Sequence, residues 1–158
     1  MMNSLKKGIS FGLTSGVITT LGLIVGLNSG THSRTVVISG IITISLADAF
    51  SDALGIHISE EVDHRHSGNQ VWVATIATFF TKLIFSLTFL LPVIFFQLSH
   101  AIVVSLIWGL LVLVALSYFI AKVQGNSAWK VIVEHVLIAI VVIGATHCIG
   151  SWVSDIFQ

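Results

Sequence analysis

The stretch ADAFSDALGIHISEEVDHRH, residues 47–66, gathers most of the chemistry that this chain could perform. It holds five of the seven acidic residues in a sequence of 158. Asp48 and Asp52 are four residues apart, so on a helix they lie on one face, about one turn from each other. Two acids at this spacing in an apolar segment indicate either a structural pair neutralised by a nearby cation, or a site for a metal ion or a proton.

A second group of candidate ligands follows at once. His57, Glu60, Glu61 and His64 stand at positions i, i+3, i+4 and i+7, so a continuous helix would place them on one stripe. Glu61-x-x-His64 has the spacing by which helices of carboxylate-bridged metal bundles offer two ligands to one ion. Imidazole and carboxylate together suit Fe²⁺, Mn²⁺, Zn²⁺ or Co²⁺ better than Ca²⁺. A solvated helix end would explain the same residue types.

The composition places these residues in a membrane protein. The chain is 55% hydrophobic and 9% charged, whereas soluble domains carry roughly a quarter charged residues. Its net charge of zero gives no support to a nucleic-acid partner. A bilayer-spanning helix needs about 20 mainly apolar residues, and five segments qualify: 8–28, 35–58, 71–96, 101–121 and 131–153. Because lipid offers no partners to backbone amides, these spans must be helical, and we expect one all-α transmembrane domain over residues 1–158.

The distribution of positive charge predicts the orientation. One side would carry only Arg34, and the other would carry Lys6, Lys7, Arg65, Lys122 and Lys130. Because cytoplasmic loops are enriched in Lys and Arg, we expect the N-terminus inside and the C-terminus outside. The expected location is a plasma membrane of the prokaryotic type.

Depth counting then predicts which polar residues meet. With about 1.5 Å of rise per residue, Asp52 is level with Thr14 and Ser15 in the first span. Asp48 is level with Lys82 in the third span. We therefore predict an ion pair between Asp48 and Lys82, and a metal site formed by Asp52 with Ser15 and Thr14.

Two further features concern helix packing. Glycines recur along the first span, which predicts close helix contacts, including contacts across a dimer interface; they are Gly8, Gly12, Gly16, Gly22 and Gly26. Pro92, late in the third span, predicts a kink.

Three segments resemble the vacuolar iron transporter family, whose members export ferrous iron and manganese in exchange for protons. FGLTSGVITTLGLIVGL is similar to the family's opening Gly-x-Asn-Asp-Gly pattern. ADAFSDALGIHISEE is similar to its Ala-Leu-Ser-Met-Ala-x-Gly-Glu segment, and TKLIFSLTFLLPVIFF to its proline-containing third span. The family's acid in the first span falls at Ser15, its methionine in the second at Asp52, and its glutamate after the glycine at Ile56.

The resemblance implies a homodimeric transporter of Fe²⁺ or Mn²⁺, without a bound cofactor, whose metal path runs near the two-fold axis between the first two spans. The stripe from His57 to His64 would collect the ion and the Asp52 region would bind it. Protonation of Asp52 would weaken metal binding and couple the two fluxes. The loss of the thioether and the gain of an oxygen ligand favour Mn²⁺.

Two other functions fit the same residues. One is a metal-sensing or structural subunit that binds metal without transport, and the other is a proton-coupled carrier of a small organic cation. No serine-histidine-acid pattern, zinc-protease motif or phosphate-binding loop occurs, so we do not expect an enzyme.

Overall fold

The computed structural model of the chain describes residues 2–62 and 67–157, and these ranges are helical apart from short turns between the helices. The helices are α1 (Met2–Thr31), α2 (Arg34–Val62), α3 (Gly68–Thr88), α4 (Leu90–Phe95), α5 (Leu98–Gln124) and α6 (Ala128–Phe157). With α3 and α4 counted as one segment, five segments of the described chain are long and apolar enough to cross a membrane. The predicted all-α fold with five spans is confirmed.

The third span breaks where the proline predicts. α3 ends at Thr88, Phe89 forms a turn, and α4 begins at Leu90. Pro92 has no N–H to donate to the carbonyl of residue 88, and its ring crowds that carbonyl. Just before the break, the N–H of Phe89 donates to the carbonyl of Ser86, three residues earlier, at 3.2 Å, which is the spacing of a tighter helical turn.

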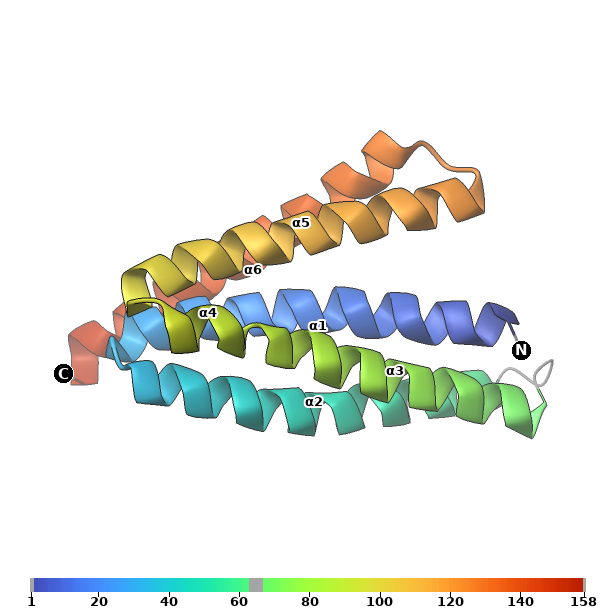
Figure 1. Ribbon diagram of the computed structural model, residues 1–158, viewed down its shortest axis with the longest axis horizontal. Helices are drawn as coiled ribbons and strands as arrows, with labels where there is room; N and C mark the ends of the chain where they lie inside the picture. Colours follow the sequence, from blue (N-terminus) through green and yellow to red (C-terminus); the bar gives the residue numbers. More distant parts are fainter. Residues whose placement is uncertain (1, 63–66, 158) are drawn as a thin grey trace.

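The helices run alternately up and down (Figure 1). The start of α1, the end of α2, the start of α3 and the α5–α6 turn lie at one end, which we call the Lys7 end. The α1–α2 turn, the α4–α5 turn and the C-terminus lie at the other, which we call the Arg34 end. The predicted distribution of Lys and Arg between two sides therefore agrees with the topology, apart from Arg65, which lies outside the described residues.

α1 is the central helix, and its glycines let it approach two partners. A Cβ at Gly8 would lie 2.4 Å from the carbonyl oxygen of Ala74 in α3, and one at Gly12 would lie 2.7 Å from that of Thr78. Further along, Gly22 and Gly26 face Val142 and Thr146 of α6. The predicted close packing is present, and these five glycines contact α3 and α6 of the same chain, because α1 lies between those two helices.

α5 and α6 pack on α1 near the Arg34 end and diverge from it toward the Lys7 end (Figure 1). A cavity of about 720 Å³ lies in this opening. Its walls are mainly apolar side chains of α1 and α5, and its polar residues are Lys6, Lys7, Ser10, Thr14 and His135.

Candidate functional site

The charged residues of three helices meet inside the bundle. The ammonium of Lys82 in α3 lies 2.6 Å from Oδ2 of Asp48 and also contacts Oδ2 of Asp52, both in α2. It donates in addition to the hydroxyl of Ser15 in α1 at 2.8 Å. The Ser15 hydroxyl in turn donates to Oδ2 of Asp52 at 2.6 Å. We call these four residues the Asp–Lys cluster.

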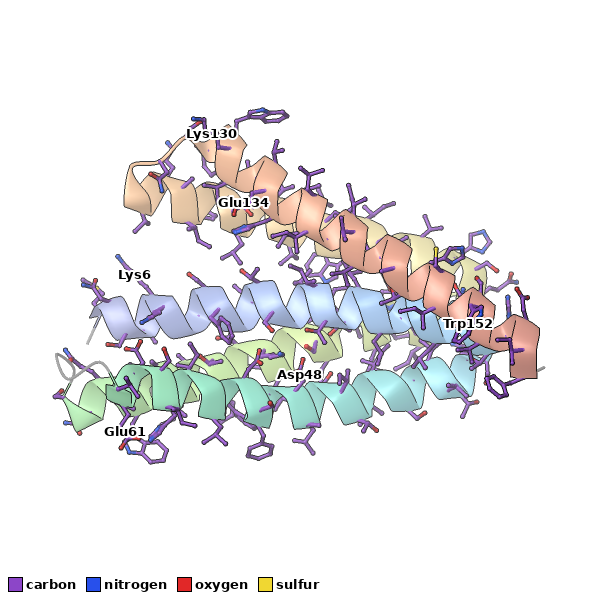
Figure 2. The ribbon with its side chains drawn as sticks, turned by 180° about the vertical axis from the view of Figure 1, so that it is seen from behind. Lys6, Asp48, Glu61, Lys130, Glu134 and Trp152 are labelled. Carbon is purple, nitrogen blue, oxygen red and sulfur yellow. The ribbon has the colours of Figure 1, made fainter. Side chains whose placement is uncertain are left out.

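Local structure explains why the cluster forms. Asp48 and Asp52 share a helix face because they are one turn apart, and Asp48 lies near the middle of α2 (Figure 2). The stem of Lys82 reaches them over Gly16, where a Cβ would come within 3.2 Å of Cγ of Lys82. The glycine at this position therefore leaves room for the lysine side chain between α1 and α3.

Burial and charge distinguish the members of the cluster. The side chain of Lys82 is 1% exposed, whereas those of Asp48 and Asp52 are 23% and 19% exposed. An ammonium has three N–H donors, and each has an oxygen acceptor here. Two carboxylates against one ammonium leave the cluster with one formal net negative charge.

The predicted contact between Asp48 and Lys82 is present, but the predicted division of roles is not. Lys82 binds both aspartates, because its ammonium lies between two carboxylates that are only one turn apart. Ser15 reaches Asp52 as expected, whereas Thr14 does not. Its hydroxyl donates to the carbonyl of Ser10 at 2.9 Å, and its side chain lines the cavity toward α5. Adjacent residues of a helix point about 100° apart, so Thr14 and Ser15 serve different faces of α1.

The stripe that follows in α2 does not converge on a point. Nδ1 of His57 lies 3.0 Å from the hydroxyl of Thr75 in α3, and the ring packs edge-on against Trp72. Glu60 is fully buried and pairs with Lys7 of α1. Glu61 is exposed at the end of α2 (Figure 2). α2 is continuous through these positions, so the three residues lie on one side of the helix as predicted, but their side chains do not meet, because His57 contacts α3, Glu60 contacts α1 and Glu61 is exposed.

The fourth member of that stripe, His64, lies outside the described residues. Among residues 2–62 and 67–157, no group of three or more His, Cys, Asp and Glu side chains is arranged to hold a metal ion. In the Asp–Lys cluster, two carboxylates and a hydroxyl supply oxygen ligands, and Lys82 occupies the point on which they converge.

The ion pair between Lys7 and Glu60 was not predicted from the sequence. Their shared position near the Lys7 end follows from the up-and-down topology once α1 and α2 are adjacent, but nothing in the sequence indicates which carboxylate Lys7 selects. The pair ties the first turns of α1 to the last turn of α2.

α2 has two exposed faces of different character. One carries large apolar residues suited to lipid, namely Ile42, Leu46, Phe50 and Leu54. The other carries small and hydroxylated residues, namely Thr43, Ala47, Ser51 and Gly55. We call this second set the small-residue face. Asp48 and Asp52 lie directly beside it, since Ser51 is three residues from Asp48 and Gly55 three from Asp52.

The family comparison agrees with this architecture. The model of the VIT family matches residues 52–151, which is well over half of the chain. The chain belongs to the VIT family. The match begins at Asp52, so it includes the rest of α2 and most of α3 to α6, while α1 and Asp48 lie outside it. No individual protein of the curated set matches the chain.

Membership of the VIT family, which is a family of vacuolar iron transporters, implies transport of metal ions across a membrane. Together with the five spans, it makes the chain an integral membrane protein. In this VIT-family protein the Asp–Lys cluster lies between the spans, with Asp48 near the middle of α2 and Lys82 buried. Ionisable residues at such depth are rare and usually mark an ion path.

Proposed function

We propose that this VIT-family protein exports Fe²⁺ or Mn²⁺ from the cytoplasm in exchange for protons, and that the ion binds at Asp48 and Asp52. The observation that carries the proposal is the convergence of two intramembrane carboxylates and the Ser15 hydroxyl on one point. Oxygen ligands without a thiolate or thioether suit Mn²⁺ somewhat better than softer ions.

A second copy of the chain completes the site in this proposal. The small-residue face of α2 exposes hydroxyls and a glycine, which are typical of helix–helix interfaces in membranes and poorly suited to lipid. The partly exposed aspartates lie beside this face. Two copies related by a two-fold axis would bring together two clusters of one net negative charge each, which matches the charge of one divalent ion.

Proton exchange follows from the same charges. A proton on Asp48 or Asp52 removes the net negative charge of a cluster and so weakens its hold on a cation. Outward movement of a charge against an inside-negative potential costs about 2.3 kcal/mol per 100 mV. Exchange of two protons for one divalent ion avoids this cost.

In this proposal, the ion leaves the cluster toward the Arg34 end past two buried hydroxyls. The side-chain oxygens of Thr20 and Ser45 are buried and have no hydrogen-bond partner among the described residues. Ser45 is three residues from Asp48 and therefore close to it on α2. These oxygens can replace part of the hydration shell of an ion that leaves the cluster.

Mn²⁺ flux into liposomes that contain only this protein tests the function. We expect a pH gradient to drive Mn²⁺ uptake, and Asp52→Asn to abolish most of it. Asp155→Asn, an exposed aspartate near the end of α6, is the matched control and should transport like the wild type. Mn²⁺ binding without flux would instead indicate a metal-binding subunit. Flux of an organic cation that Mn²⁺ does not inhibit would indicate the organic-cation carrier.

A further inference from the structure

Lys82 is the most deeply buried member of the Asp–Lys cluster. Its side chain is 1% exposed, yet all three N–H donors of its ammonium find oxygen acceptors: Asp48, Asp52 and Ser15. Both aspartates use the same atom, Oδ2, for this contact. The nitrogen therefore marks the point at which oxygen ligands from α1 and α2 converge.

We propose that Lys82 is a built-in competitor for the transported ion. Its ammonium occupies the cation position while the site is empty, and an arriving divalent ion must displace it. This inference rests on the proposed function, in that the ion binds at Asp48 and Asp52. It adds that Lys82 sets how tightly the ion is held and helps to release it.

Charge explains the competition. The ammonium lies at the point on which the Oδ2 atoms of both aspartates converge, so an ion bound by the same atoms would lie directly against a like charge. Repulsion between two close positive charges is strong in a low-dielectric interior, so the ammonium must move away from the carboxylates before the ion is bound stably. When it returns it restores the paired state, which lowers the barrier to ion release.

The lysine side chain is suited to such movement. It ends in a compact charge on a flexible four-carbon stem, whereas arginine has a rigid fork that can bind two carboxylate oxygens at once. The stem crosses α1 at Gly16, where there is no side chain to hold it. Replacement by glutamine or by arginine should therefore change ion binding in opposite directions.

The test measures Mn²⁺ affinity of the purified full chain by titration calorimetry, together with flux in liposomes. We expect Lys82→Gln to bind Mn²⁺ about tenfold or more tightly and to transport it more slowly, because a close competing charge has been removed. We expect Lys82→Arg to bind Mn²⁺ about fivefold or more weakly, because its fork is harder to displace. Lys130→Gln, an exposed lysine of α6 (Figure 2), is the matched control and should leave both measurements unchanged.

The outcomes separate this inference from the proposed function. If wild-type flux depends on Asp52 but Lys82→Gln binds Mn²⁺ no more tightly, the role of Lys82 is refuted and the transport function stands. If the glutamine variant does not fold, Lys82→Arg decides alone, and wild-type affinity and flux in that variant refute the competition. If the wild type neither binds nor transports Mn²⁺, the proposed function fails and the inference fails with it.

Discussion

At the scale of single residues, the cluster shows how a membrane interior tolerates three ionisable side chains. Lys82 is neutralised by two carboxylates, and Ser15 completes its third hydrogen bond. Removal of the ammonium would leave two adjacent carboxylates without compensation, and removal of the Ser15 hydroxyl would leave one N–H of the ammonium without an acceptor. The individual contributions can be measured by substitutions that remove one group at a time.

Removal of the ammonium should destabilise the protein, and removal of one carboxylate should restore much of the loss. Lys82→Met leaves Asp48 and Asp52 as two adjacent negative charges, and we expect a loss of about 3 kcal/mol in the free energy of unfolding. Lys82→Met/Asp48→Asn returns the net charge to its wild-type value. Thermal unfolding in detergent measures both variants, and a double variant no more stable than the single one would show that the pair does not carry this stability.

Ser15 and Thr14 are adjacent hydroxyls with different predicted effects. Ser15→Ala removes a donor to Asp52 and an acceptor for Lys82, so we expect a loss of about 1–2 kcal/mol in stability and weaker Mn²⁺ binding. Thr14→Val keeps the side-chain shape and removes only the bond to the Ser10 carbonyl. Calorimetric Mn²⁺ titrations of the two variants check this, and an equal loss of affinity in both would mean that Thr14 also faces the site.

At the scale of helices, the glycines of α1 decide how the bundle closes. They bring α1 against α3 at Gly8 and Gly12, and this approach also places Ser15 beside Lys82. At the other end of α4, Arg34 of α2 caps the last turn, since its Nε donates to the carbonyl of Val93 at 2.8 Å and its guanidinium also donates to the carbonyl of Ile94. The cluster thus depends on helix spacing as much as on its own residues.

A methyl group at this contact should separate α1 from α3. Gly12→Ala places a Cβ 2.7 Å from the carbonyl oxygen of Thr78, and we expect a loss of about 2 kcal/mol in stability, as for other overpacked interiors. Gly144→Ala in α6 is the control, because this exposed position has nothing within 4 Å of an added Cβ. Thermal unfolding in detergent compares the two, and equal melting temperatures would contradict the proposed role of the α1–α3 contact.

At the scale of the whole molecule, the exposed surface indicates where a second copy would bind. Most exposed side chains are large and apolar, as lipid requires, whereas the small-residue face of α2 is not. The aspartates beside that face are each about one-fifth exposed in the single chain. A partner at this position would remove them from lipid.

Cross-linking tests this dimer. In a Cys148→Ser background, which removes the single native cysteine, we expect Ser51→Cys to form a covalent dimer when membranes are oxidised. Ile84→Cys, an exposed position of α3, should remain monomeric on the same gels. Cross-linking at Ile84 in preference to Ser51 would place the interface elsewhere.

Cysteine labelling in whole cells tests the orientation. In the same background we expect Ser33→Cys, in the α1–α2 turn, to react with a membrane-impermeant maleimide. Asn126→Cys, in the α5–α6 turn, should react only after permeabilisation, because the positive residues favour a cytoplasmic Lys7 end. The reverse pattern would invert the direction of transport in the proposal.

The sequence alone determined that the chain lies in a membrane and that its fold is all-α. It also determined the depth along the spans at which the charged residues lie. Apolar segments of spanning length must be helices in lipid, and the constant rise per residue placed Ser15 level with Asp52 and predicted that Lys82 would contact Asp48. These results need no knowledge of which helices are neighbours. Pro92 likewise marked the break in the third span through its local chemistry.

Only the tertiary structure decided which faces meet. Helix rotation about its axis separates Thr14 from Ser15, sends His57 to Thr75 and Glu60 to Lys7, and directs the glycines of α1 inward. Sequence spacing gives the angle between side chains on one helix but not the neighbour toward which that angle points. That neighbour is set by packing of all five spans, and here it places Lys82 between both aspartates.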